Sequence, residues 1–510
     1  MNRNLQIIQN ELSSMKLDDS LLFLNHVLGV SREFTTDSVL GPVIAESSPP
    51  VLPHVVHFLA KQLILNGSNL GTRTLGWNSY CYLSGLCIEL DDPIVHDPTW
   101  KDADPSGFFE RLMAQQISPQ RRNFIQKYGL ALGLFRDVGT INWPTTFDLR
   151  VEIEKEIQVP LDQFMGMGHV AFALRTAKHQ NNECMGTFTP MMLAEAFRQG
   201  IDFCVPEVWT PFLNRVTTDR DGFRNVCLSE GYSVESDVFE QFSFNPLRRF
   251  PITHVGEHRY LAVDPELIVE RVTTGLFYDL FERDRTRFSE RFGFAYEQFV
   301  GQLLGSVCKS ECLWSAADWE RIADNTKRQS MKMGDWAYIG NQSTVLFECK
   351  SLRPSLALTT SGSDGSIVDL NTRVASALRQ LIGQSNGIQN GDWGQAGLQK
   401  AATVAVIVTY GKFYTLNGPF ARKRIRQLVE EKGDTPIPFV VLSLDELDSV
   451  LRLVELGHSL EELIQTMASN EESFDPLSVF QEELKNCAVS SFTFSKGDAF
   501  LKQVTKGGRT

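Results

Sequence analysis

Apolar residues recur along this chain at two different spacings, and the change from one spacing to the other divides the chain. In the first half they repeat at helical intervals, which predicts amphipathic helices at about 5–30, 54–65, 107–134, 162–178, 190–201 and 206–215. No internal repeat or low-complexity tract interrupts this region. Residues 1–241 are therefore expected to form a mostly helical N-terminal region.

Short β patterns begin near residue 242. Two runs rich in β-branched and aromatic residues, 250–255 and 258–263, predict a small hairpin. Asp264 followed by Pro265 is typical of a helix start, and longer helical stretches are predicted at 266–283 and 288–308. We assign 242–287 to a connecting segment made of this hairpin and the helix after it.

An α/β pattern follows residue 310. Strands are predicted at 335–339, 344–350, 402–409 and 439–444, and helices at 371–384 and 422–432. The run 402–409 is apolar throughout, as in a strand buried on both faces. The order of elements predicts an α/β fold over 288–450, with a mixed sheet flanked by helices, and a helical C-terminal extension over 451–510.

Composition narrows the class of protein. A length of 510 residues allows several domains, and 42% hydrophobic with 22% charged residues is typical of a globular protein. The net charge of −13 argues against a surface coated with basic residues, while a local basic groove stays compatible with it. Nine cysteines without a CxxC pair indicate reduced thiols. Because neither a signal peptide nor an apolar run long enough for a bilayer is found, we expect a cytoplasmic protein that does not bind membranes.

The segment 334–350 carries the most informative chemistry. Glu348 and Lys350 are two positions apart on a predicted strand, so their side chains leave the same face. Residues 340–343, Gly-Asn-Gln-Ser, form a turn sequence, and a hairpin centred on it places Asp335 opposite Glu348. Residues so opposed have Cβ atoms about 4.5–5.5 Å apart, and two carboxylates at that distance repel unless one is protonated or a cation lies between them.

A divalent cation with oxygen ligands fits such a pair of carboxylates. The ion would polarise a phosphoryl oxygen and lower the pKa of a bound water, and Lys350 would orient that water or stabilise charge on the phosphate. The competing interpretation is a surface hairpin with an ordinary Glu–Lys pair, because charged residues two positions apart are common on strands.

Asp335, Glu348 and Lys350 resemble the motif of the PD-(D/E)xK nuclease superfamily. In that family an Asp on one strand, and a Glu or Asp two residues before a Lys on the next, bind Mg²⁺ and activate water. The resemblance covers about 290–450, including the two later apolar strands. It implies a restriction-endonuclease-like fold and a Mg²⁺ cofactor, for which Mn²⁺ would substitute.

The same resemblance implies supporting residues on the neighbouring helices. The family's preceding helix often carries a Glu near the metal, which Glu297 matches, with a solvated helix edge as the alternative. The following helix often carries a Gln near the site, which Gln380 or Gln384 matches. One departure from the family's pattern is that Gly334 stands where a Pro precedes the Asp.

Basic residues lie near the predicted catalytic strands and on the helix after the 402–409 strand. Clusters of Lys and Arg bind nucleic-acid phosphates through charge, and the alternative is an ordinary solvated helix face. The candidate phosphate-binding residues are Arg353, Arg373, Lys412, Arg422, Lys423, Arg424 and Arg426.

These patterns together predict a Mg²⁺-dependent endonuclease that acts on DNA. Two alternatives stay open: cleavage of RNA, and a non-catalytic nuclease-like module in an interaction or assembly protein. The helical N-terminal region is expected to serve target recognition, binding of a protein partner or a second copy, or control. By analogy with bacterial restriction and anti-phage effectors, we expect a role in defence.

Overall fold

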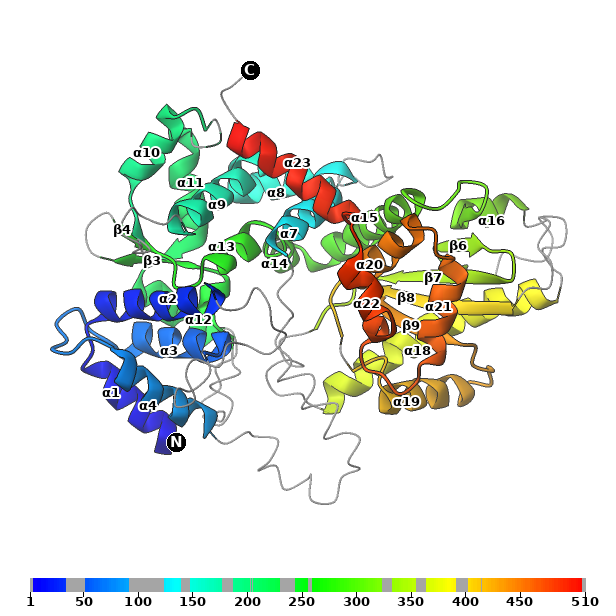
Figure 1. The fold of residues 1–510 in the computed structure, drawn as a ribbon, viewed down its shortest axis with the longest axis horizontal. Helices are drawn as coiled ribbons and strands as arrows, with labels where there is room; N and C mark the ends of the chain where they lie inside the picture. Colours follow the sequence, from blue (N-terminus) through cyan, green and yellow to red (C-terminus); the bar gives the residue numbers. More distant parts are fainter. Residues whose placement is uncertain are drawn as a thin grey trace.

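The computed structural model describes residues 3–33, 51–90, 123–138, 147–176, 187–201, 203, 205–229, 244–255, 259–322, 333–354, 364–390, 402–413 and 415–506. Helices dominate the chain before residue 250, and a five-stranded sheet lies after residue 310. Figure 1 shows the N-terminal helices at one end of the molecule and the five-stranded sheet with its helices at the other. The α/β class and the mostly helical N-terminal region are therefore as predicted.

The N-terminal helices coincide with most of the predicted ones. The described helices are α1 (Arg3–Ser13), α2 (Leu17–Glu33), α3 (Pro53–Asn66), α4 (Trp77–Ile88), α7 (Phe124–Ala131), the π-helical η2 (Leu132–Asp137), α8 (Leu149–Ile157), α9 (Leu161–Thr176), α10 (Pro190–Arg198), α11 (Pro206–Val216) and α12 (Arg220–Ser229). The part of the predicted helix 107–134 before residue 123 lies outside the described residues. Helix α4 was not predicted because it contains no charged residue that would mark a polar face.

A small four-stranded sheet joins the N-terminal region to the connecting segment. Its order is β1-β4-β3-β2, and the predicted hairpin is confirmed as β3 (Ile252–Val255) and β4 (Arg259–Leu261), with its turn outside the described residues. The outer strands β1 (Thr187–Phe188) and β2 (Thr217–Thr218) have two residues each, which is too short for a recognisable pattern.

The connecting segment continues into two helices rather than one. The side chain of Asp264 caps α13 (Pro265–Val272) by accepting a hydrogen bond from the N–H of Glu266 at 2.9 Å, so the predicted helix start is confirmed. The prediction of a single helix over 266–283 is wrong, because the backbone turns at 273–275 before α14 (Leu276–Arg283) begins. A long helix, α15 (Arg285–Gly305), follows and reaches the larger sheet.

The larger sheet is mixed and has the order β5-β6-β7-β8-β9. Its strands are β5 (Leu313–Ser315), β6 (Trp336–Ile339), β7 (Ser343–Lys350), β8 (Ala402–Thr409) and β9 (Phe439–Ser443). Strand β6 runs antiparallel to both of its neighbours, β5 and β7, and β7, β8 and β9 run parallel. In β8 every residue except Ala402 is buried, as the apolar run predicted.

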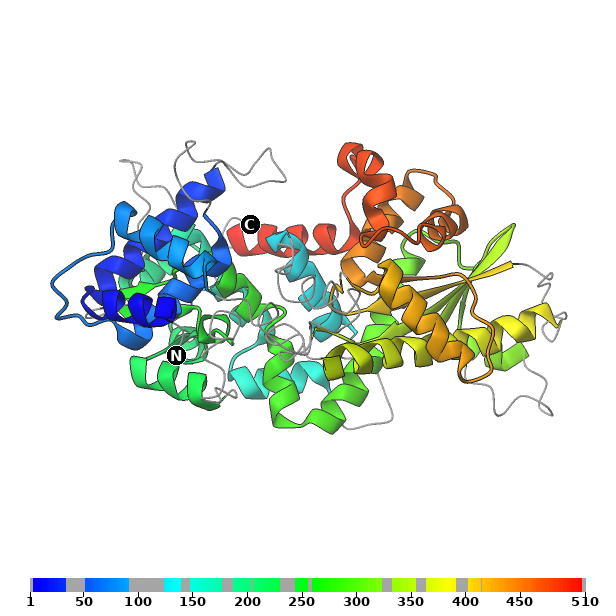
Figure 2. The same cartoon turned by 90° about the horizontal axis from the view of Figure 1, so that it is seen from below.

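Helices cover both faces of this sheet (Figure 2). On one face, Leu346 of β7 and Ile407 of β8 pack with residues of α18 (Asp364–Gln389) and α19 (Pro419–Glu430). On the other face, Phe347 and Val408 pack with residues of α15, α20 (Leu444–Glu455) and α21 (Leu460–Ser469). Side chains two positions apart on β7 therefore share a face, which fixes the side from which Glu348 and Lys350 project.

The C-terminal segment returns to the helical region. After η7 (Pro476–Phe480) and α22 (Gln481–Asn486), helix α23 (Phe492–Lys506) runs back along α7, and Figure 1 shows it spanning from the sheet to the N-terminal helices. The two helices approach closely because each has a glycine at the crossing: a Cβ on Gly129 would lie 1.7 Å from the carbonyl oxygen of Thr493, and one on Gly497 would lie 1.9 Å from that of Ile125. An ion pair between Lys496 and Asp137 flanks the crossing.

One hydrophobic cluster extends from the N-terminal helices η2, α8 and α9 through α15 to the larger sheet. The segment 288–450 consequently shares its core with residues outside its predicted bounds. No described helix is both long and apolar enough to cross a membrane. No disulfide joins the seven cysteines that the structure describes.

Candidate metal centre

The β6–β7 hairpin determines where the candidate catalytic residues lie relative to one another. Trp336 pairs with Phe347 across the two strands, so Asp335, one residue before Trp336, stands opposite Glu348, one residue after Phe347. The predicted register is confirmed. The backbone N–H of Cys349 donates a 2.7 Å hydrogen bond to Oδ2 of Asp335, which holds that carboxylate beside the C-terminal end of β7.

Glu348 is almost completely buried, with 2% of its surface exposed. One of its carboxylate oxygens, Oε1, is bonded to the ammonium group of Lys350. The other, Oε2, is buried and has no hydrogen-bond partner among the described residues. Lys350 itself is a third exposed, so the pair opens towards solvent on the lysine side. A buried carboxylate oxygen without a partner is costly, and a bound cation would provide one.

The three acidic residues of the site influence one another electrostatically. Burial raises the pKa of Glu348 to about 8, and the charge of Asp335 adds to this, while Lys350 opposes it. Burial and the charge of Asp335 also raise the pKa of Glu297 to about 7. For Asp335, burial raises the pKa, and the N–H of Cys349 and the charge of Lys350 act in the opposite direction. The site therefore resists carrying all of its negative charge without a cation.

Glu297 lies on α15, where this helix meets β6. The indole N–H of Trp336 donates to the backbone carbonyl of Glu297 at 3.0 Å. The ring packs directly on Gly301, where a Cβ would lie 2.0 Å from its Cζ2 atom. Among the described residues, however, no group of three or more His, Cys, Asp or Glu side chains is arranged to hold a metal ion. Glu297 interacts with Asp335 through charge, and the roles of Asp335, Glu348 and Glu297 as metal ligands stay predictions.

The two candidate glutamines bind the backbone just before Asp335. Nε2 of Gln380 donates to the carbonyl oxygen of Met333 at 2.6 Å. Oε1 of Gln384 accepts from the N–H of Gly334 at 3.0 Å. Gln380 therefore contacts the backbone that leads into Asp335, and in the described part of the chain no hydrogen bond joins its side chain to Asp335, Glu348 or Lys350.

The basic cluster of the sequence analysis is only partly exposed. Arg422 is 1% exposed, and its guanidinium donates to the carbonyl oxygens of Asn417 at 2.9 Å, Ala468 at 2.8 Å and Met467 at 3.3 Å. The prediction that Arg422 contacts phosphate is therefore wrong, because its hydrogen-bond donors hold the loop before α19 and the end of α21 together. Its basic neighbours in sequence, Lys423, Arg424 and Arg426, concealed this role.

Two further basic candidates are also engaged inside the protein. The guanidinium carbon of Arg353 lies 3.7 Å from the ring centres of both Phe277 and Tyr278, so it stacks on helix α14. Lys412 forms a 3.1 Å ion pair with the buried Glu446, and only 17% of its side chain is exposed. For both residues this corrects the prediction that the side chain is free to bind a phosphate of nucleic acid.

The remaining basic candidates lie on exposed surfaces. Arg426 is paired with Glu471 and Arg373 with Asp369, which reduces the charge they offer to a ligand. Lys423 and Arg424 on α19 are exposed, and Arg424 donates to Gln427 at 3.0 Å and lies 3.9 Å from Glu431. Their role in phosphate binding stays a prediction.

The turn of the hairpin is held by a residue that sequence analysis missed. The carboxylate of Glu461 on α21 accepts hydrogen bonds from the backbone N–H groups of Asn341, Gln342 and Ser343, at 3.2, 3.1 and 2.8 Å. Gly340 makes room for it, since a Cβ there would lie 2.0 Å from one carboxylate oxygen. Nothing in the sequence links two segments so far apart, although the Gly-Asn-Gln-Ser turn did show that backbone donors would be available there.

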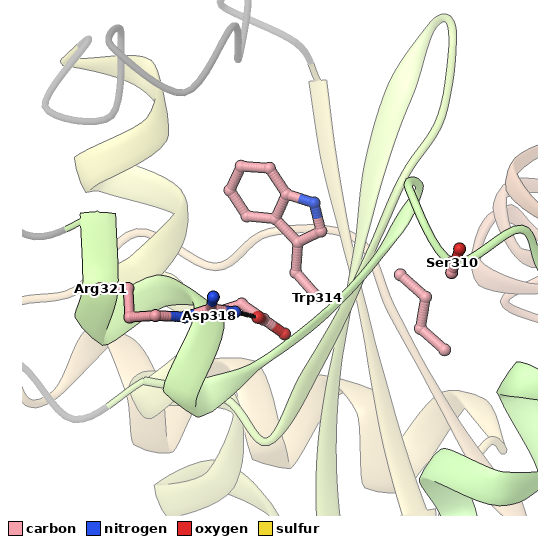
Figure 3. A pocket seen from close by; sticks show the side chains of 5 residues that line it. Ser310, Trp314, Asp318 and Arg321 are labelled. Atoms are coloured by element: carbon pink, nitrogen blue, oxygen red, sulfur yellow. Dashed lines mark hydrogen bonds and ion pairs between the residues drawn. The ribbon is translucent and has the colours of Figure 1, made fainter.

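Two surface hollows lie along strands β5 and β6. One of them, at the edge strand β5, has a volume of about 320 Å³ and is lined by Ser310, Leu313, Trp314, Asp318 and Arg321 (Figure 3). The Asp318 carboxylate there is bonded to Arg321 and Ser315. A second hollow of about 250 Å³ adjoins Cys308 and Tyr338. Neither is lined by Asp335 or Glu348.

The carboxylate pair fits a small hard cation. Mg²⁺ typically retains several waters and is bound by one or two carboxylates together with substrate phosphates. Asp335 and Glu348 supply two such groups, and Oε2 of Glu348 is a buried acceptor without a partner in the described part of the chain.

No protein-family model, no curated protein and no solved structure matches this chain.

Proposed function

We propose that this protein is a metal-dependent phosphodiesterase that cleaves nucleic acid, with a restriction-endonuclease-like arrangement of β6, β7, β8 and α18. The observation that carries the proposal is the opposition of Asp335 and Glu348 across the hairpin, with Lys350 on the same face as Glu348. The raised pKa values of the buried carboxylates add support, because perturbed acids gather at functional sites.

The chemistry assigned to each residue follows from its surroundings. Asp335 and Glu348 would hold Mg²⁺ or Mn²⁺, which when bound polarises a phosphoryl oxygen and lowers the pKa of a water ligand. Lys350 is bonded to Glu348 and partly exposed, so its ammonium group is accessible to an approaching phosphate. It would stabilise the negative charge that develops on the phosphate during hydrolysis.

DNA is the proposed substrate, and RNA is the alternative that the assay must separate. The net charge of −13 repels a polyanion at long range, so binding depends on local positive groups. Lys423 and Arg424 on the exposed side of α19 are the proposed local contacts. The helical N-terminal region would then provide recognition, partner binding or control, in analogy with defence nucleases.

Cleavage of linear, supercoiled and single-stranded DNA and of RNA, with Mg²⁺ or Mn²⁺, tests the proposal. We expect divalent-dependent cleavage that EDTA abolishes, and loss of most activity in Asp335→Ala, Glu348→Ala and Lys350→Ala. Asp369→Ala is the matched control, because Asp369 is an exposed acid on α18. Wild-type cleavage by any one of the three variants would remove that residue from the mechanism.

A second candidate is a non-catalytic nuclease-like module. One observation favours it: the described residues offer no third His, Cys, Asp or Glu ligand beside Asp335 and Glu348. Titration of the wild-type protein with Mn²⁺ separates the two, since a module that has lost catalysis through loss of the metal site would bind no ion at Asp335. Binding that Asp335→Ala abolishes favours the enzyme.

A further inference from the structure

The backbone that leads into Asp335 is fixed by two side chains of helix α18. Gln380 donates to the carbonyl oxygen of Met333 at 2.6 Å, and Gln384 accepts from the N–H of Gly334 at 3.0 Å. The two glutamines are four positions apart, so they project from the same side of the helix. Two consecutive residues before the proposed metal ligand are thus each held by one glutamine.

Gly334 permits this arrangement in two ways. Its N–H is the donor to Gln384, and a proline at this position would have none. It also lacks a Cβ, which would lie 2.6 Å from Cδ2 of Leu381 and 2.9 Å from the carbonyl oxygen of Phe347. The glycine therefore allows the chain to approach α18 and β7 closely enough for the bond to form.

If Gln384 served only to fill space, it would cost more free energy than an apolar side chain at the same buried position. It is 1% exposed, and its Nε2 atom is buried without a hydrogen-bond partner among the described residues. An apolar side chain of similar shape, such as Met, would fill the same space without stranding a buried donor. The acceptor Oε1 is what distinguishes Gln from Met here, and its one recorded partner is the N–H of Gly334.

We propose that Gln384, assisted by Gln380, is a positioning residue of the metal centre that fixes Asp335 opposite Glu348. In this chain, hydrogen bonds with two glutamines hold the backbone before Asp335. A proline at position 334 would stiffen the same backbone through its ring. The inference rests on the proposed function, because it assigns the purpose of the contact to metal binding. Both glutamines act through the backbone of residues 333–334 and touch neither metal nor substrate.

Mn²⁺ affinity of the full-length protein tests the positioning role. Gln384→Met removes the acceptor and keeps the volume, and we expect affinity to fall about tenfold, as for loss of one buried hydrogen bond. Gln380→Met is a milder second variant, because Gln380 is only half-buried. Gln389→Met is the matched control, an exposed glutamine on the same helix. Affinity in Gln384→Met equal to that of the control would overturn the proposal.

Hydrogen exchange gives a readout that needs no metal. In EDTA, the Gly334 amide should exchange faster in Gln384→Met than in wild type and in Gln389→Met, while amides of β8 stay protected. Unchanged exchange at Gly334 would show that the contact does not hold the backbone, and would overturn the inference alone. Absence of Mn²⁺ binding by the wild type would overturn the proposed function, and the positioning role with it.

Discussion

Asp335 accepts a 2.7 Å hydrogen bond from the backbone N–H of Cys349, the residue between Glu348 and Lys350. This bond occupies Oδ2 of Asp335, as Lys350 occupies Oε1 of Glu348. Each carboxylate thus uses one oxygen to hold its own geometry. Both groups are therefore held by partners within the protein itself, as the proposed metal site would require.

Substitutions of the buried and of the exposed cations of α19 should have different effects: the first on the stability of the fold, the second on DNA binding. Arg422→Ala would leave three buried carbonyl oxygens without their donor, so we expect a loss of about 3 kcal/mol or more in the free energy of unfolding. Combined Lys423→Ala and Arg424→Ala should leave stability nearly unchanged and flatten the slope of log affinity against log salt by up to about 0.9 for each phosphate interaction removed. Denaturant unfolding and DNA binding at several salt concentrations measure the two effects.

Lys502→Ala on α23 is the control for charge alone, because this lysine is exposed and far along the chain from α19. An unchanged salt slope in the double variant would return Lys423 and Arg424 to an ordinary solvated helix face. A stable Arg422→Ala protein would contradict its role in joining the loop before α19 to α21.

The crossing of α7 and α23 gives a prediction about the whole chain. Gly497→Ala places a Cβ 1.9 Å from the carbonyl oxygen of Ile125, so α23 must move away from α7. We expect destabilisation by about 1–3 kcal/mol, typical of overpacking, although alanine favours a helix more than glycine does. Limited proteolysis should then release α23 faster, whereas Gln503→Ala on its exposed side should not change the rate. A stabilised Gly497→Ala would contradict the close crossing.

The sequence predicted local elements better than the contacts between distant ones. Periodicity located α9, α10, α11 and β8 closely, because each follows its own hydrophobic pattern. The turn 340–343 fixed the register of Asp335 against Glu348, since a hairpin is a local structure. In contrast, the burial of Arg422 depends on carbonyl groups at 467 and 468, and that of Arg353 on rings at 277 and 278. Charge patterns alone gave no sign of those partners.

The raised pKa values of Glu348 and Glu297 predict how the stability of the metal-free protein depends on pH. Burial raises their pKa values from 4.5 to about 8 and about 7, so between pH 4.5 and 8 the folded protein keeps protons that the unfolded chain has lost. Stability should therefore fall as pH rises through this window, by up to about 1.4 kcal/mol per pH unit for each such proton. Unfolding midpoints in EDTA from pH 5 to 9 measure this.

Glu348→Gln provides the comparison for the pH series. Glutamine does not titrate, so the variant should lose the contribution that falls between pH 4.5 and 8 and show a shallower dependence than wild type. An identical dependence in both proteins would mean that Glu348 is not a buried acid with a raised pKa. Addition of Mg²⁺ should flatten the wild-type curve, because the ion replaces the proton.

The last prediction tests whether Asp335 and Glu348 share an ion. As pH rises above 8, Glu348 of the metal-free protein loses its proton opposite Asp335 across the hairpin, and opposed like charges destabilise a strand pair by roughly 0.2–1 kcal/mol or more when buried. Asp335→Asn keeps the shape, and its side-chain oxygen can still accept from the N–H of Cys349. The variant should therefore melt higher than wild type at pH 8.5 in EDTA, and by less at pH 6, where Glu348 is protonated.

Mg²⁺ should reverse this order. Binding to the folded state alone stabilises by about 2.7 kcal/mol when the ion is present at a hundred times its dissociation constant. Wild type should gain this at pH 8.5, while Asp335→Asn, with one anionic ligand removed, should gain little. Asp369→Asn, an exposed acid on α18, should behave as wild type in both conditions. If Asp335→Asn melts lower in EDTA and gains as much from Mg²⁺ as wild type, the two carboxylates do not bind one ion, and the proposed site fails even though the hairpin register stands.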